Sequence, residues 1–218
     1  MSKRRHSRHS HWGLLFLMAA LTIMLYVTYR HYRGRLPEFP DNSRYETLEE
    51  RATAALKVAR RHGLNTDYCL MVDYSVPSGT PRLYMWSFKT NEVKARTYVM
   101  HGPGRGSTAE KPVFSNRPGS NCSALGRFIV TRSHGSKIKR SYRMRGLDLD
   151  NQTAWQRGLM IHRSTWVDRH CGEAYIPLHP VSCQGCVTVS SRGMDYLEQL
   201  IEGEERNLLL WSFCSGSM

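Results

Sequence analysis

The sequence has few cysteines, and its first 35 residues contain no acid. Six cysteines among 218 residues are too few to build a fold from disulfides. Residues 1–35 carry seven of the 31 Lys and Arg, so about half of the net charge of +13 lies in that segment. The rest of the chain has 24 basic and 18 acidic residues, a net charge of only +6. The high isoelectric point is therefore poor evidence for a nucleic-acid partner. Without an internal repeat, the length fits one domain plus an appendage.

Charge is also missing from residues 12–29, which as a helix would be about 27 Å long. This length is close to the roughly 30 Å of a bilayer core, and aromatic residues at both ends suit its interfaces. A cleaved signal peptide is the alternative, but no good cleavage site follows the run. We expect a basic cytoplasmic tail at 1–11 and an uncleaved transmembrane anchor at 12–29.

Residues 30–63 combine a proline-containing linker with one amphipathic helix. Ser43 and Glu46 have the spacing of a capping box, and apolar residues then recur every three or four positions up to Gly63. We expect this helix to pack across the domain that follows it.

From residue 64 to 218, short runs of aromatic and β-branched residues alternate with turn signals. The absence of a βαβ rhythm favours a mainly β fold, a sandwich or a barrel, with one or two helices. A helix is expected at 191–202. The expected strands are 68–75, 82–88, 92–100, 128–131, 142–145, 158–162, 186–190 and 207–213.

Gly185 and Cys186 stand just ahead of one of these strands. A glycine lets the backbone approach a reacting carbonyl closely, and a thiol is a nucleophile when a base lies beside it. His162 ends an apolar strand and is the candidate base. The alternative interpretation is that Cys186 is a small hydrophobic residue of the core without a catalytic role.

The order of several motifs resembles the L,D-transpeptidase catalytic domain, in its murein L,D-transpeptidase subfamily. Ile161-His162 followed by Gln184-Gly185-Cys186-Val187 is similar to the family's histidine and Ser-x-Gly-Cys signature. The resemblance covers about residues 65–200. Its upstream motifs are His101-Gly-Pro-Gly104, Phe114-Ser-Asn116, Gly119-Ser120, Ser123-Ala-Leu-Gly126 and Tyr142 to Asp148.

This resemblance implies a β-sandwich or barrel-like L,D-transpeptidase fold that forms peptidoglycan cross-links without a cofactor. Cys186 would attack a stem-peptide carbonyl, His162 would be its base, and Gly185 with Cys186 would bind the oxyanion. The expected partners are peptidoglycan stem peptides and the bacterial inner membrane, with the catalytic domain in the periplasm and no nucleic acid. The residues expected to bind substrate are Ser182, Cys183, Gln184, Thr188, Ser164 and His101.

Two positions depart from the family pattern. Cys183 stands where the signature has serine, and Thr188 stands where a basic residue is common. Recognition of the D-alanine carboxylate must therefore come from elsewhere. An insert around 168–180 makes the interval between the histidine and the cysteine long, and it could form a lid.

Other chemistries remain open around the same cysteines. Cys183 and Cys186 have the C-x-x-C spacing of redox sites, although a strand rather than a helix follows them. Together with Cys171 and His179 they could bind zinc. A Cys171–Cys183 disulfide could instead brace the loop. The nine basic residues between 111 and 147, with no acid among them, could attract wall carboxylates or form a solvated face.

Overall fold

The chain forms two separate units, residues 1–36 and residues 37–218. The computed structural model describes residues 9–33, 45–134, 141–179 and 184–214. Most of the basic tail, the linker with Ser43, and the predicted site residues Ser182 and Cys183 lie outside the described residues.

The first unit contains helix α1 (His9–Arg33), which includes the uncharged run. Among the described residues, no helix is both long and apolar enough to cross a membrane. The anchor predicted at 12–29 is therefore not confirmed.

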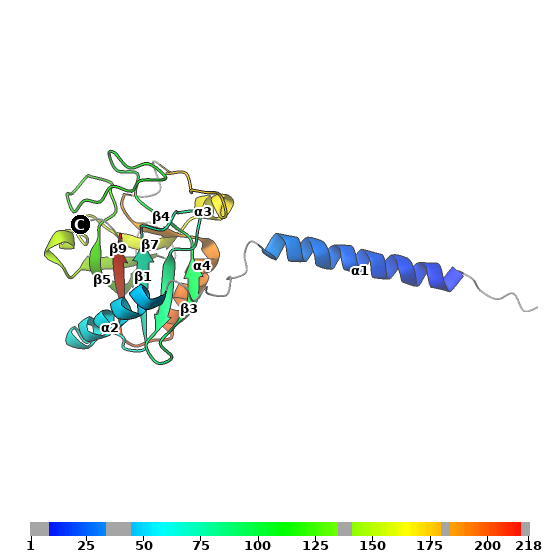
Figure 1. Cartoon of the computed structure of the whole chain (residues 1–218), viewed down its shortest axis with the longest axis horizontal. Coiled ribbons are helices and arrows are strands. Elements are labelled where there is room, and N and C mark those ends of the chain that lie inside the picture. The colour runs from blue at the N-terminus through cyan, green and yellow to red at the C-terminus, as the bar shows by residue number, and fades with distance from the viewer. Residues whose placement is uncertain (1–8, 34–44, 135–140, 180–183, 215–218) are drawn as a thin grey trace, which may run out of the picture. The chain divides into compact units, whose positions relative to one another are not determined.

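The second unit is built on one sheet of nine strands (Figure 1). Their order is β3-β2-β1-β9-β5-β6-β7-β8-β4, with β1–β9 and β7–β8 parallel and the other neighbours antiparallel. β9, the last strand in the chain, therefore lies inside the sheet, between β1 and β5. The strands are β1 (Tyr68–Asp73), β2 (Leu83–Ser87), β3 (Glu92–Thr97), β4 (Val99–Met100), β5 (Gly126–His134), β6 (Ser141–Gly146), β7 (Met160–Arg163), β8 (Val187–Val189) and β9 (Leu208–Phe213).

The two edge strands, β3 and β4, are separated in the chain only by Tyr98. Because one residue spans at most about 3.6 Å, the sheet must curl until its two edges meet. Thr97 Oγ1, at the end of β3, lies 2.7 Å from Ser190 Oγ, which follows β8. The sheet is thus barrel-like, as expected. The single strand predicted at 92–100 is wrong, because these residues supply both edges.

Helix α2 (Tyr45–Arg61) covers one face of the sheet (Figure 1). Its buried alanines, Ala52, Ala55 and Ala59, share an apolar cluster with Met71 of β1 and Leu209 of β9. The predicted packing of this helix across the domain is confirmed. The helix also belongs to the same compact unit as the sheet, although the predicted domain began only at residue 64.

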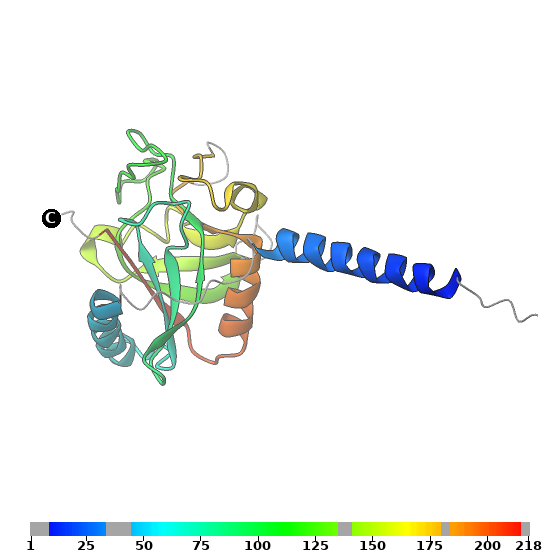
Figure 2. The ribbon, with the colours of Figure 1, turned by 45° about the vertical axis from the view of Figure 1, so that its right-hand side comes forward.

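The opposite side of the sheet packs against α4 (Ser191–Glu202), which runs beside the strands in Figure 2. Met194, Leu197 and Ile201 of this helix are buried in the main core. Short helix η2 (Leu149–Asn151) follows β6. With α2, α3 (Thr165–His170) and α4 in the second unit, the expectation of one or two helices was too low.

Helix α3 (Thr165–His170) lies between the parallel strands β7 and β8. Parallel neighbours need a crossover of a dozen residues or more, usually helical. Residues 164–186 are that crossover, so the long interval between His162 and Cys186 has a topological reason. The sequence shows no βαβ rhythm, but β7, α3 and β8 form a βαβ unit, and the candidate site lies there.

Candidate active site

Strand register brings His162 and Cys186 to the same face of the sheet. His162 lies opposite Thr188 on the parallel neighbour β8, and Cys186 precedes Thr188 by two residues. Side chains alternate between faces, so His162, Thr188 and Cys186 point to one side. Cys186 accordingly clusters with Met100, which pairs with Thr188, and with Met160, which precedes His162 by two. Cys186 therefore directly precedes the strand that pairs with that of His162, on the same side of the sheet.

The ring of His162 is oriented by the backbone of the next residue. Its Nδ1 lies 3.0 Å from the Arg163 carbonyl oxygen. Since a carbonyl only accepts, Nδ1 carries the proton of the neutral ring, and Nε2 holds the lone pair. Nε2 faces β8, where Thr188 Oγ1 lies 3.3 Å away. The basic nitrogen is therefore turned toward the strand that Cys186 precedes.

Burial keeps this base neutral. Only 3% of His162 is exposed. Burial lowers the pKa of the imidazole, and the bond to the Arg163 carbonyl raises it by a smaller amount. A neutral imidazole at pH 7 can accept a thiol proton.

Gly185 has a backbone conformation that other residues rarely adopt, with φ +99°. A Cβ at this position would lie 2.1 Å from the carbonyl oxygen of Cys122 and 2.7 Å from Nη2 of Arg157. On its other side, a Cβ on Gly102 would lie 2.8 Å from the Gly185 Cα. Gly185 is therefore enclosed by backbone, and the residue before the thiol must be glycine.

A model of the L,D-transpeptidase catalytic domain family matches residues 41–211. The chain belongs to this family. A search of curated proteins finds no match.

Two solved structures resemble this L,D-transpeptidase-family chain. One is an L,D-transpeptidase from Xylanimonas cellulosilytica, with 16% identity, a TM-score of 0.37, and coverage of 72% of this chain and 68% of that one. The other is the helical cell shape determining protein Pgp2 from Campylobacter jejuni, with 9% identity and a TM-score of 0.41. That match covers 70% of this chain and 50% of Pgp2, so the chain spans about half the length of Pgp2.

Of the residues expected to bind substrate in this family member, Ser164 and Thr188 have other contacts, whereas Gln184 is exposed. Ser164 accepts from the Trp166 amide at 3.2 Å and caps the N-terminus of α3. Thr188 is fully buried against His162. Gln184 is exposed beside Gly185. These contacts give Ser164 a role in the fold, whereas Gln184 is accessible to a ligand.

His101 is fully buried rather than exposed on its loop. Arg82 Nη2 lies 3.0 Å from its Nδ1, and its Nε2 lies 2.9 Å from the Thr108 carbonyl oxygen. Burial, with the Arg82 charge, lowers the pKa of His101 to about 4. Both ring nitrogens are therefore used within the protein, and the geometry offers no direct support for a substrate contact.

The alternative zinc and disulfide sites both include Cys183, outside the described residues. Within the described part of the chain, no group of three His, Cys, Asp or Glu side chains could hold a metal. Cys171 Sγ donates to the Val167 carbonyl at 3.0 Å, and the His179 ring packs on Trp166 with centroids 4.8 Å apart. The Cys171–Cys183 disulfide stays a prediction.

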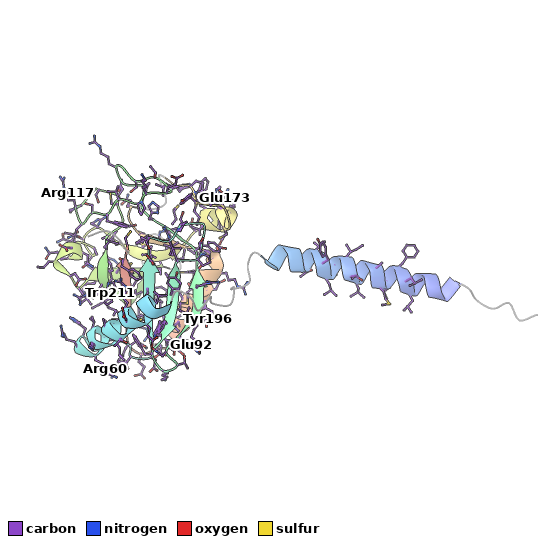
Figure 3. All side chains as sticks on the ribbon, in the orientation of Figure 1. Arg60, Glu92, Arg117, Glu173, Tyr196 and Trp211 are labelled. Atoms are coloured by element: carbon purple, nitrogen blue, oxygen red, sulfur yellow. The ribbon has the colours of Figure 1, made fainter. Side chains whose placement is uncertain are left out.

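Several arginines of the acid-free segment 111–147 are already occupied. Arg127 forms an ion pair with Asp148. Arg143 stacks over Trp155, 3.7 Å from the ring centroid, and donates to the Trp155 carbonyl at 2.8 Å. Arg117 is exposed on the loop side of the domain, as Figure 3 shows. Only some of the basic residues in this segment are therefore free to attract wall carboxylates from solvent.

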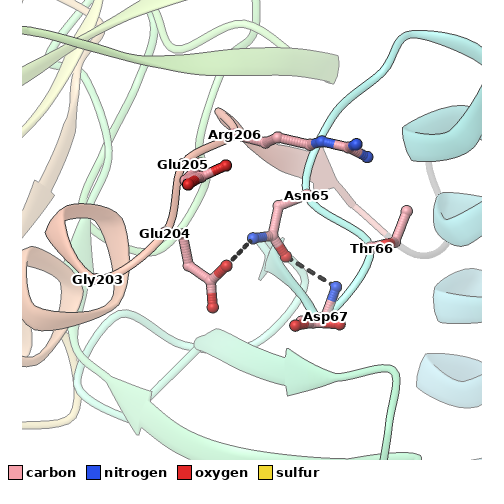
Figure 4. A pocket seen from close by; sticks show the side chains of 7 residues that line it. All are labelled: Asn65, Thr66, Asp67, Gly203, Glu204, Glu205 and Arg206. Atoms are coloured by element: carbon pink, nitrogen blue, oxygen red, sulfur yellow. Dashed lines mark hydrogen bonds between the residues drawn. The ribbon is translucent and has the colours of Figure 1, made fainter.

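One pocket lies at the start of β1 and β9 and is lined by Asn65, Thr66, Asp67 and residues 203–206 (Figure 4). Asn65 donates to Glu204 at 2.7 Å and accepts from the Asp67 amide at 2.8 Å. Since β8 runs opposite to β9, Cys186 lies at the other end of the strands. The pocket is therefore remote from the candidate dyad.

Sequence reasoning did not identify the carbonyl that orients His162 or the side chain that lies against Gly185. The first belongs to the Arg163 backbone, which any residue supplies, so no residue type signals it. The second is Arg157, whose contacts are with carbonyl oxygens far along the chain. No spacing rule reveals such contacts.

Proposed function

We propose that the chain is a cysteine L,D-transpeptidase that acts on peptidoglycan stem peptides through a thioester at Cys186. The family match over residues 41–211 supports an enzyme that acts on peptidoglycan. The observation that carries the finer proposal is the pairing of β7 with β8, which turns the His162 lone pair toward the strand after Cys186.

In the proposed reaction, the Cys186 thiol transfers its proton to His162 Nε2. The thiolate attacks the carbonyl carbon of the L-centre, and the amides of Gly185 and Cys186 stabilise the oxyanion. The bond to D-alanine then breaks as His162 returns the proton to the leaving amine. An amine of a second stem peptide attacks the thioester, forms the cross-link and releases the thiol.

The test is to incubate the full-length protein with purified disaccharide-tetrapeptides and to separate the products. Cross-linked dimers are the expected result, and tripeptides alone would mean that water resolves the thioester. A carbapenem should label Cys186 stoichiometrically, and a protein without label on Cys186 would be a wall-binding module instead.

Cys183 provides a matched control for the nucleophile. Cys186→Ser should abolish acylation, whereas Cys183→Ser should keep most of it. Loss of activity in both variants, or a mixed disulfide trapped on Cys183→Ser, would indicate thiol–disulfide chemistry instead.

The proposed location is the bacterial inner membrane, with the catalytic domain in the periplasm. The support is the uncharged run 12–29 in the sequence, together with a substrate class found in the wall. Protease added to spheroplasts should then degrade residues 37–218, and deletion of residues 1–35 should release the domain from the membrane fraction. A protein that fractionates with the cytoplasm would overturn this location.

A further inference from the structure

We propose that Arg157 is a positioning residue that fixes the Gly185 backbone at the place where the oxyanion of acyl transfer forms. The inference rests on the proposed function of Cys186. Arg157 lies in the turn before β7, where its amide donates to the Thr153 carbonyl at 2.9 Å. Its side chain leaves that turn and contacts a loop more than thirty residues earlier in the chain.

The guanidinium of Arg157 holds the two ends of this loop together. Nη1 donates to the Ser115 carbonyl at 2.7 Å, and Nη2 donates to the Cys122 carbonyl at 2.5 Å. The same ends also pair through backbone, because the Ser115 amide donates to the Ser123 carbonyl at 3.0 Å. The guanidinium of Arg157 thus bridges two carbonyl oxygens from residues seven positions apart. Its planar arrangement of N–H donors suits this geometry.

The two hydrogen bonds from Arg157 to the Ser115 and Cys122 carbonyls, called the clamp below, lie directly against Gly185. The absent Cβ of Gly185 would meet both the Cys122 oxygen and Arg157 Nη2, so the clamp lies against the Gly185 Cα. Gly102 lies on another side of Gly185, and its amide donates to Ser123 Oγ at 3.0 Å. Movement of the Cys122 carbonyl would therefore move the backbone just before the thiol.

The position of that backbone matters for acyl transfer more than for thiol reactivity in general. Oxyanion donors must be held about 2.7–3.1 Å from the developing charge, and a displacement of 1 Å can lower the rate about 100-fold. Alkylation of a thiolate by iodoacetamide displaces iodide and forms no oxyanion. The two reactions of Cys186 should therefore respond differently when the clamp is loosened.

The experiment measures both reactions at Cys186 in the full-length protein by mass spectrometry of the peptide that contains it. Arg157→Lys keeps the charge but cannot bridge both carbonyls, so carbapenem acylation should fall about tenfold, and in Arg157→Ala about 100-fold. Alkylation should stay within about threefold in both, because it needs no oxyanion donor. Millimolar guanidinium should restore part of the acylation of Arg157→Ala.

Arg132→Lys is the matched control, since Arg132 also donates to a backbone carbonyl, that of Glu205, beside the remote pocket. Its acylation should equal that of the wild type. Unchanged acylation in Arg157→Lys, or an equal fall of acylation and alkylation, would overturn the inference. Wild-type protein that alkylates but never acylates would instead overturn the proposed function. If Arg157→Ala does not fold, the ratio of acylation rate to alkylation rate in Arg157→Lys tests the inference alone.

Discussion

His162 and His101 are both buried, and each bonds a backbone carbonyl, but their second nitrogens differ. In His101 an arginine donates to Nδ1, so no lone pair is left for chemistry. In His162 the Nδ1–H donates to the Arg163 carbonyl, and the lone pair on Nε2 lies 3.3 Å from the hydroxyl of Thr188. Burial therefore does not distinguish a catalytic base from a structural histidine. The group at the lone pair does, which is a guanidinium in His101 and a hydroxyl in His162.

The largest expected effect is that of His162→Ala on acylation of Cys186. Loss of a general base lowers such rates about 10²- to 10⁴-fold, and carbapenem acylation should fall within that range. Far-UV circular dichroism should stay unchanged. If a folded His101→Asn variant loses as much acylation as His162→Ala, the distinction between His162 as the base and His101 as a structural residue is wrong.

The second prediction concerns stability in acid. His101 has a folded pKa of about 4, below the usual value of 6.5, so the unfolded chain takes up a proton first as the pH falls. Stability present above pH 6.5 should therefore be lost between pH 6.5 and 4, by about 3 kcal/mol. Urea unfolding across this range measures the loss. His101→Asn should flatten the dependence, and an equally steep curve in that variant would contradict the assignment.

The third prediction concerns the pH dependence of acylation. Because burial lowers the pKa of His162, the neutral base should persist below pH 6.5. The acid limb of the acylation rate should accordingly lie below that of an ordinary histidine. Stopped acylation assays from pH 4 to 8 would show it, and a limb above pH 6.5 would mean that another group is the base.

The smallest effect is expected for Thr188→Val, which removes the hydroxyl beside His162 Nε2 while keeping the branched shape. A hydroxyl that donates to the lone pair stabilises the neutral ring, so its removal should raise the pKa of His162. The acid limb should move to higher pH, with a rate change within about tenfold. The same limb in both proteins would show that the hydroxyl does not donate to Nε2.

Much of the fold could be predicted from the sequence because local patterns determine it. Short apolar runs between turn signals identified β1, β2 and β9, and helical spacing identified α2 and α4. The split of 92–100 into β3 and β4 could not be predicted, since both pieces have strand patterns and only their distant partners separate them. Helix α3 has six residues, too few for a clear period.

The candidate site divides in the same way. Cys186, Gly185 and His162 could be named because their residue types and order carry chemistry. The burial of His101 could not, because it depends on Arg82 reaching across from β2's start to the loop after β4. Contacts of this kind are made by long side chains between segments that no periodicity relates.

The position of β9 has a consequence for folding during synthesis. Residues 208–213 form an interior strand, β9, which pairs with β1 on one side and β5 on the other. The ribosome makes this strand after all the other strands of the sheet. Until it emerges, β1 and β5 each expose an open edge that can pair with another chain. The nascent protein therefore depends on a late, long-range strand pairing to join these two edges.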